Sequence, residues 1–197
     1  MINRIMKMAG DKALKIDVGK LDLARLPEEV TEINDISYIE DGLPGHTMDI
    51  YIRKDGAKKP VLIDIHGGGF ISEDKAMNRL FGNDMARLGF TVFEINFRIA
   101  YPEWTVFDQI KDIDRAVRYA LDNADSYEAD RDQLYIAGHS SGGVLALSEA
   151  LLCVDPQMRA DYGISDRDYS YKGILTDCGL MHFYKSSIAT FLSGILH

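Results

Sequence analysis

The stretch "LYIAGHSSGG", residues 134–143, decides the fold. It begins as a short apolar run typical of a buried strand and ends with two serines enclosed by glycines. Glycine is used where a backbone bends sharply or is approached closely. Residues 138–142 match G-x-S-x-G, in which a serine stands as a nucleophile on a strained turn between a strand and a helix. The pattern predicts Ser140 as a nucleophile at a helix N-terminus, where N–H groups and the helix dipole favour developing negative charge.

A second motif, "HGGGF" at residues 66–70, follows the apolar run "PVLIDI" at 60–65. Consecutive glycines let main-chain N–H groups converge on an anion, as in an oxyanion hole. A phosphate-binding loop would need Gly-Lys-Ser/Thr after the glycines, whereas Phe70 and Ile71 follow here. We therefore expect the Ser140 hydroxyl to face the loop at 67–69. For both motifs the alternative is a tight turn without a chemical role.

The order of apolar patterns along the chain predicts an α/β fold. Residues 31–39 and 47–54 alternate apolar and polar positions around a turn, which is typical of a β-hairpin. From residue 60 onwards apolar runs alternate with helical patterns, and this order implies a mostly parallel sheet with helices on both faces. The expected strands are residues 60–65, 90–97, 130–138 and 171–180, and the expected helices are 73–89, 106–124 and 143–154.

The composition excludes several classes of partner. The net charge is -9, and no basic stripe is present to displace counterions from a nucleic acid. The N-terminus has no signal-peptide pattern, and no run approaches the roughly 18 apolar residues that span a bilayer. Cys153 and Cys178 lack metal-ligand spacing and form no disulfide framework. We expect both to be reduced and buried in a cytoplasmic protein that has no metal and no cofactor.

The pair HGGGF and GHSSGG resembles the hormone-sensitive-lipase-like carboxylesterases of the α/β-hydrolase superfamily. The segments "NFRIAYPEWTVFDQIKDIDRAVRYAL" and "DRDQLYIAGHSSGG" are also similar to that family, so the resemblance covers roughly residues 30–180. It implies Ser140 as the nucleophile, with the main-chain N–H groups of Gly68, Gly69 and Ser141 as oxyanion donors. It also implies that His66 supports the glycine loop.

Three residues depart from the family's pattern. His139 stands where the family usually has an acidic residue, Ser141 where it has alanine, and Tyr101 is an extra residue in the A-P-E segment. The first two changes remove no oxyanion donor, because those donors are main-chain groups. The extra tyrosine could reshape the acyl pocket, so the family's substrates do not transfer directly.

The family's catalytic acid and histidine follow the nucleophile, on loops after later strands. The run at 171–180 corresponds to the sixth of eight strands, and about seventeen residues follow it, fewer than one βα unit of about thirty residues needs. The resemblance therefore implies a C-terminally truncated chain whose acid and histidine lie beyond residue 197. Asp177 with His182 is the local alternative, and His197 is a further candidate base. A fold cut short would also expose a sheet edge that favours self-association.

Residues 1–30 are expected to form an N-terminal arm and residues 31–197 an incomplete α/β-hydrolase domain. The expected function is a serine esterase that hydrolyses small carboxylic esters through an acyl-enzyme on Ser140. Turnover is expected to be feeble, because the family's histidine is expected to lie beyond residue 197 and a general base typically raises the rate about a hundred- to ten-thousand-fold. Two alternatives remain open: another acyl hydrolase of the same fold, such as an arylformamidase or a peptidase, and a non-catalytic binding protein.

Overall fold

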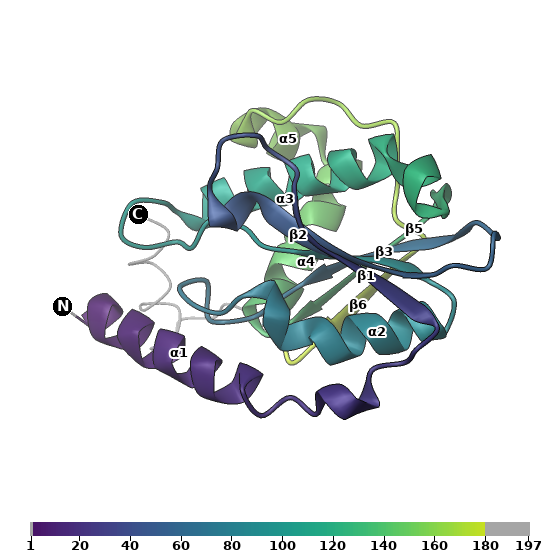
Figure 1. The fold of residues 1–197 in the computed structure, drawn as a ribbon. Helices are drawn as coiled ribbons and strands as arrows, with labels where there is room; N and C mark the ends of the chain where they lie inside the picture. Colours follow the sequence, from purple (N-terminus) through teal and green to yellow (C-terminus); the bar gives the residue numbers. More distant parts are fainter. Residues whose placement is uncertain (1, 180–197) are drawn as a thin grey trace.

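The computed structural model describes residues 2–179, which form one six-stranded sheet with helices on both faces (Figure 1). Among the described residues, four short 3-10 helices lie between the longer elements: η1 (Leu23–Arg25), η2 (Pro44–His46), η3 (Lys75–Asn78) and η4 (Ala124–Tyr127). The strands are β1 (Val30–Ser37), β2 (Thr47–Arg53), β3 (Lys59–Ile65), β4 (Thr91–Ile95), β5 (Ala129–His139) and β6 (Gly173–Asp177). The α-helices are α1 (Ile2–Val18), α2 (Arg79–Arg87), α3 (Val106–Asp122), α4 (Ser141–Val154) and α5 (Pro156–Tyr162).

The strand order is β1-β2-β4-β3-β5-β6. Strands β4, β3, β5 and β6 run parallel, while the β1–β2 hairpin adds to β4 in antiparallel pairing. Ile63 of β3 is in register with Phe93 on one side and with Ile136 on the other. The predicted α/β class is therefore confirmed, and the runs expected as strands at 60–65, 90–97 and 130–138 correspond to β3, β4 and β5, which lie side by side in the sheet.

Two apolar layers hold the helices against the sheet. On one face Ile63 and Ile65 pack with the apolar side of α3, where Ile113 and Val117 are fully buried, and with α4. On the other face Leu62 belongs to a smaller apolar cluster with Met85 and Ala86 of α2. Burying one such side chain stabilises the fold by about 1.5–3 kcal/mol. The predicted apolar stripe of the 106–124 helix is thus the contact that attaches α3 to the sheet.

Three local expectations differ from the structure. The alternation in 47–54 indicated a half-buried strand, yet β2 is buried from Met48 to Ile52, because it lies between β1 and β4 and is covered on both faces. The expected 73–89 helix is a 3-10 turn, η3 (Lys75–Asn78), followed by α2, and Leu88 beyond it is 69% exposed. Helix α5 was not predicted, although Asp155 caps it and Pro156 occupies its first position.

A buried ionic cluster fastens the segment before β6 to the helices. Arg167 contacts Glu149 of α4 at 2.7 Å and Asp114 of α3 at 2.8 Å. The Tyr171 hydroxyl donates to the same glutamate at 3.1 Å. Burial raises the pKa of Glu149 to about 7, although Arg167 opposes this shift. The cluster therefore fixes where the chain enters β6, the last strand beside the candidate site.

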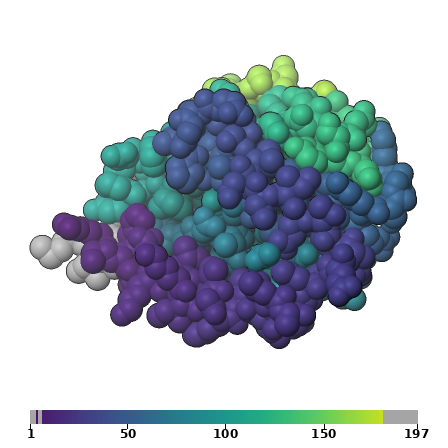
Figure 2. Space-filling view, in the orientation of Figure 1, coloured from purple at the N-terminus to yellow at the C-terminus, as the bar shows by residue number. Residues whose placement is uncertain are grey.

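The N-terminal residues run along one edge of the molecule, where they are coloured purple (Figure 2). Residues 1–28 were expected to be an amphipathic, helical arm, and α1 occupies most of that range. The helix lies against the segment after the glycine loop: a Cβ on Gly10 would meet the Ser72 hydroxyl at 2.5 Å. The boundary between an arm at 1–30 and a domain at 31–197 stays a prediction.

Candidate active site

Ser140 occupies a strained turn between β5 and α4. Its φ of 54° and ψ of -118° place it in a region that non-glycine residues avoid, at a cost of about 1–3 kcal/mol. The flanking glycines have no room for a side chain: a Cβ on Gly138 would overlap the Gly142 carbonyl, and one on Gly142 would overlap the Ile65 carbonyl. The strand–turn–helix context predicted for the G-x-S-x-G motif is confirmed.

Main-chain hydrogen bonds hold the serine turn in place. The Ser140 N–H donates to the carbonyl oxygen of Asp177 at 2.7 Å, and the Gly143 N–H donates to the Ser140 carbonyl at 3.1 Å. The first bond joins the turn to the end of β6, and the second closes the first turn of α4. The strained conformation of Ser140 is thus held by a hydrogen bond to β6 on one side and by the first turn of α4 on the other.

The glycine loop follows β3 and folds back on itself. Gly68 has a φ of +91°, and its carbonyl accepts from the Ser72 N–H at 3.1 Å and the Ser72 hydroxyl at 2.9 Å. A Cβ on Gly68 would overlap the Ser72 carbonyl. Glycine is therefore required at this position for its backbone angle and for lack of space.

The loop and the serine turn lie together at the carboxyl ends of β3 and β5. The Phe70 N–H donates to the Ser141 hydroxyl at 3.2 Å, and a Cβ on Gly67 would lie 3.1 Å from the His139 carbonyl. Within residues 2–179, the N–H groups of Gly68, Gly69 and Ser141 donate to no acceptor. These three residues are the ones that the family resemblance implies as oxyanion donors, and that role stays a prediction.

His66 packs beneath the loop. It is 1% exposed, its ring stacks on Phe97 with centroids 4.3 Å apart, and its Nδ1 lies 3.2 Å from the Gly67 carbonyl. Burial lowers its pKa to about 4, so the ring is neutral at pH 7. These contacts agree with a supporting role, and within the described residues the Nε2 atom has no hydrogen-bond partner.

Asp64 is a buried acid behind the site. It is 3% exposed and accepts from the Asn78 side chain at 2.6 Å, as expected of a polar residue in an apolar strand. Burial raises its pKa to about 6. A cavity of about 190 Å³ opens next to it, and Phe81, Leu175 and Asp177 contribute to the lining.

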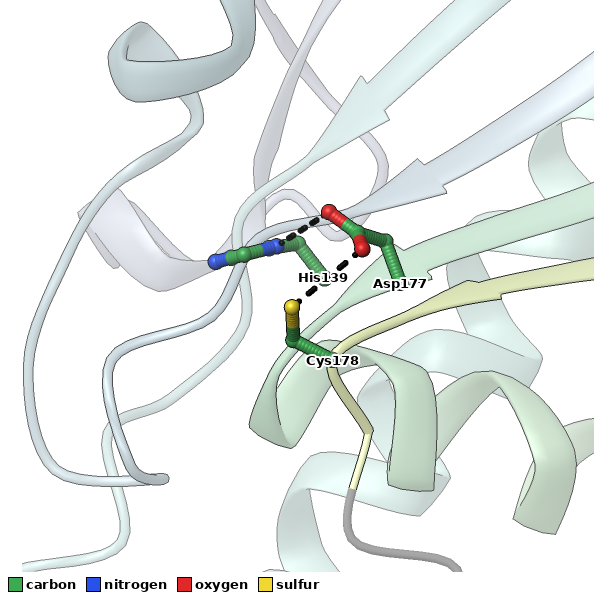
Figure 3. A group of neighbouring side chains, drawn as sticks. All are labelled: His139, Asp177 and Cys178. Atoms are coloured by element: carbon green, nitrogen blue, oxygen red, sulfur yellow. Dashed lines mark hydrogen bonds and ion pairs between the residues drawn. The ribbon is translucent and has the colours of Figure 1, made fainter.

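Asp177, the local candidate for the catalytic acid, lies at the end of β6 and is exposed (Figure 3). Its carboxylate contacts His139 Nδ1 at 3.1 Å and Cys178 Sγ at 3.3 Å, and hydrogen bonds from Cys178 and His139 lower its pKa. Within residues 2–179, no histidine hydrogen-bonds to the Ser140 side chain. The candidate bases His182 and His197 lie outside the described residues.

The cysteine expectation is wrong in part. Cys153 and Cys178 are both free thiols, but Cys153 is half-buried and Cys178 is exposed. Cys178 follows a short strand at the edge of the described sheet, so no neighbouring strand covers it. An apolar neighbourhood in the sequence was a poor guide to its burial.

Sequence reasoning missed two hydrogen-bond partners in the site, one from the main chain and one from a side chain. The Asp177 carbonyl supports the Ser140 turn, and the Ser141 hydroxyl orders the Phe70 amide. The second had a signal in the sequence, since the departure from alanine at 141 supplies a hydroxyl next to the turn. The first had none, because a carbonyl group is present at every position.

Within residues 2–179, no helix has the length and apolar character needed to cross a bilayer.

The fold is that of an α/β-hydrolase, and solved structures share it. Esterase B from Lactobacillus rhamnosis, inhibited by a tributyrin phosphonate, superposes with a TM-score of 0.87 at 22% identity, covering 98% of this chain and 62% of its own. A bacterial heroin esterase superposes with a TM-score of 0.67 at 21% identity, and the superposition covers 94% of this chain and 54% of the heroin esterase. These likenesses establish the fold. The predicted family resemblance is confirmed at the level of sequence, where residues 48–188 match the BD-FAE family model, so the chain belongs to the BD-FAE family.

Curated relatives agree over the central part of the chain. A probable isoprenylcysteine alpha-carbonyl methylesterase of Oryza sativa subsp. japonica is 31% identical over 111 residues, which are 56% of this chain and 27% of that protein. Esterase LipC of Mycobacterium tuberculosis is 31% identical over 122 residues, which are 60% of this chain and 30% of that protein. The matched segments thus span less than a third of the length of these relatives.

Proposed function

We propose that this chain is a serine esterase that acts on small carboxylic esters. The Phe70–Ser141 hydrogen bond carries the proposal, because it brings the glycine loop against the serine turn. Ser140 then lies at a helix N-terminus beside N–H groups of Gly68, Gly69 and Ser141 that have no acceptor among the described residues. The names of the relatives, which are esterases and methylesterases, support the same class of reaction.

In the proposed reaction the Ser140 hydroxyl oxygen attacks the ester carbonyl carbon. The carbonyl oxygen becomes an oxyanion that accepts from the three N–H groups, and the proton of the Ser140 hydroxyl passes, through the base or water, to the alcohol oxygen as its C–O bond breaks. Water then hydrolyses the acyl-enzyme and restores the serine. One oxyanion donor typically accounts for about a hundred- to a thousand-fold in kcat.

Turnover by residues 1–197 is proposed to be feeble. A serine of ordinary pKa needs a base, and none of the histidines in residues 2–179 bonds to Ser140. About a thousand-fold acceleration over water survives from an oxyanion hole and binding alone. We therefore expect detectable but slow hydrolysis of short p-nitrophenyl esters.

A fluorophosphonate probe tests the proposal, since it labels a serine that can attack an electrophile. The full chain should be labelled slowly, in keeping with its slow turnover, Ser140→Ala should abolish labelling, and exposed Ser126→Ala should leave its rate unchanged. Hydrolysis of short esters, lost with Ser140→Ala, supports the esterase. Faster cleavage of N-formyl anilides or peptides would identify another acyl hydrolase. Absence of labelling and of hydrolysis would contradict the proposal and favour a binding protein.

A second variant locates the base. If ester hydrolysis is lost in His182→Ala as well as in Ser140→Ala, His182 is the base of the chain and turnover is not limited by its absence. If His182→Ala leaves the slow rate unchanged, water or another group accepts the proton. Either result leaves the role of Ser140 standing.

We also infer a cytoplasmic location and self-association through β6. The two free thiols suit a reducing compartment. Ile174 and Leu175 are 45% and 54% exposed on a strand at the edge of the described sheet. An open apolar edge strand favours pairing with a second copy of the chain.

A further inference from the structure

Three potential metal ligands of different chemistry meet at the carboxyl ends of β5 and β6. His139, Asp177 and Cys178 each offer one donor atom, and these atoms all lie within 4.8 Å of one another. Figure 3 shows the imidazole and the thiol on the two oxygens of one carboxylate. His139 Nδ1 is 3.1 Å from Oδ2 of Asp177, and Cys178 Sγ is 3.3 Å from Oδ1.

The main chain holds the three residues in place. His139 and Asp177 are register partners in the parallel β5–β6 pair. The Asp177 carbonyl also accepts from the Ser140 N–H at 2.7 Å, which fixes the end of β6 against the end of β5. Cys178 has a φ of 54°, a left-handed conformation, and its thiol reaches back to the carboxylate of the preceding residue. The three donor atoms are therefore held within 4.8 Å of one another by main-chain contacts of the two strand ends.

The donor set suits Zn²⁺. Imidazole nitrogen, carboxylate oxygen and thiolate sulfur are its three protein ligand types, at about 2.0–2.3 Å, so tetrahedral donors lie about 3.3–3.8 Å apart. The observed spacings, from 3.1 Å to at most 4.8 Å, bracket that range. All three side chains are exposed, so water can fill the fourth position. A hard cation such as Mg²⁺ prefers oxygen donors and does not fit this set.

The surroundings favour added positive charge. Two further carboxyl groups, those of Glu73 and Asp64, lie near enough to His139 to interact with it: burial raises the pKa of both, and His139 opposes this rise. A Cβ on Gly67 would lie 3.2 Å from Glu73 Oε2 and 3.3 Å from the His139 ring, which places this second carboxylate beside the imidazole. Within residues 2–179, no lysine or arginine forms an ion pair with Asp177.

We propose that His139, Asp177 and Cys178 bind one Zn²⁺ ion beside the Ser140 turn. Binding displaces the thiol proton of Cys178 to solvent, because the thiolate is the ligand, and it requires the neutral imidazole of His139. The proposed steps at Ser140 and the oxyanion donors use none of the three side chains, and Asp177 would enter catalysis only if His182 were the base. Its ligands come from both strands that support Ser140, so the ion would cross-link the base of the serine turn.

Calorimetric titration of the untagged, reduced full chain with ZnCl₂ tests the site. We expect one ion per chain, and we expect Cys178→Ser and Asp177→Asn to weaken binding by at least about tenfold. Cys153→Ser is the matched control, since this second thiol lies in α4, contacts Arg167 and should not affect affinity. Circular dichroism of each variant without metal should match that of the unmodified chain.

Cobalt gives a second readout, whose first observation is made on the unmodified chain. Co²⁺ added to the unmodified chain should produce a near-ultraviolet thiolate-to-metal charge-transfer band, which Zn²⁺ should abolish by displacement. The band should persist in Cys153→Ser and disappear in Cys178→Ser. Lack of Zn²⁺ binding, lack of the band, or equal affinity in Cys178→Ser and the unmodified chain would overturn the proposal. Ester hydrolysis is not measured here, so the result is separate from the test of Ser140.

Discussion

The main-chain N–H of Phe70 donates a hydrogen bond to the side-chain oxygen of Ser141 over 3.2 Å. The two residues are 71 positions apart in the chain and belong to the glycine loop and the serine turn. An alanine at 141, which the family resemblance led us to expect, could not accept this bond. The hydroxyl therefore adds a direct link between the two motifs that the candidate oxyanion hole requires.

Replacing Ser141 by alanine should remove that link. Phe70 is buried, so its N–H would lose its acceptor away from water, and the free energy of unfolding should fall by about 1–3 kcal/mol. Urea unfolding followed by circular dichroism measures this change. Exposed Ser126→Ala is the control and should shift stability by less than about 0.5 kcal/mol. Equal effects of the two variants would show that the Phe70–Ser141 bond adds no stability.

Asp64 should make the protein less stable as pH rises from about 4 to 6. Burial raises the pKa of the folded carboxyl to about 6 from an ordinary value of 3.8. Within this window the folded state holds a proton that the unfolded chain has released, so the free energy of unfolding falls with pH, by at most about 3 kcal/mol. Asp64→Asn should flatten the decline, as measured by urea unfolding at several pH values. Exposed Asp132→Asn should retain the decline; an identical slope in both variants would contradict the role of Asp64.

Arg167 should matter most when Glu149 is ionised. Removing Arg167 leaves a fully buried carboxylate, and breaking such a pair costs about 3–5 kcal/mol. Arg167→Met should show this loss at pH 8 and a smaller one at pH 5, below the pKa of about 7 of Glu149, where the carboxyl is protonated. Thermal unfolding at the two pH values measures the difference.

The double variant Glu149→Met with Arg167→Met separates charge from packing. Because both ionic groups are gone, it should recover much of the stability lost at pH 8. If it is as unstable as Arg167→Met alone, the side-chain volume of Arg167, rather than its charge, holds the segment before β6.

Leu175 on β6 should control self-association. The side chain is 54% exposed on an edge strand of the described sheet, and a lysine there would place charges opposite each other in a paired edge. We expect Leu175→Lys to weaken association at least about tenfold in sedimentation velocity experiments. Leu23→Lys, an exposed leucine in the N-terminal arm, should associate like the unmodified chain. A monomeric unmodified chain would contradict the inferred edge contact.

Much of the fold was predictable, because burial on both faces leaves a distinct pattern. The continuous apolar run at 60–65 indicated a central strand, and β3 indeed lies between β4 and β5. The pattern failed at β2, where Asp49 suggested a solvent-facing position. Asp49 is 7% exposed and pairs with Lys75 at 2.8 Å. The polar position in the strand pattern therefore reflects a buried ion pair and not a face in contact with solvent.

The candidate site was predictable as far as local geometry determines it. Glycine spacing around Ser140 predicted the tight turn, and the overlaps at Gly138 and Gly142 explain why that spacing is needed. The partners of the turn come from distant segments, such as the Asp177 carbonyl and the Phe70 amide. Such contacts depend on strand register, which no short motif contains.

The placement of β3 between β4 and β5 also has a consequence for synthesis. When the ribosome has released β3 and β4, one edge of β3 is still without its neighbour, because β4 ends at Ile95 and β5 ends only at His139. At about 5–20 residues per second, this interval lasts about 2–9 s. Throughout it the apolar strand at 61–65 can pair with another nascent chain on the same messenger RNA. The strand order therefore determines how long this apolar edge needs protection, for example by a chaperone, during translation. In the folded protein the same edge is paired with β5, so the surface gives no sign of this need.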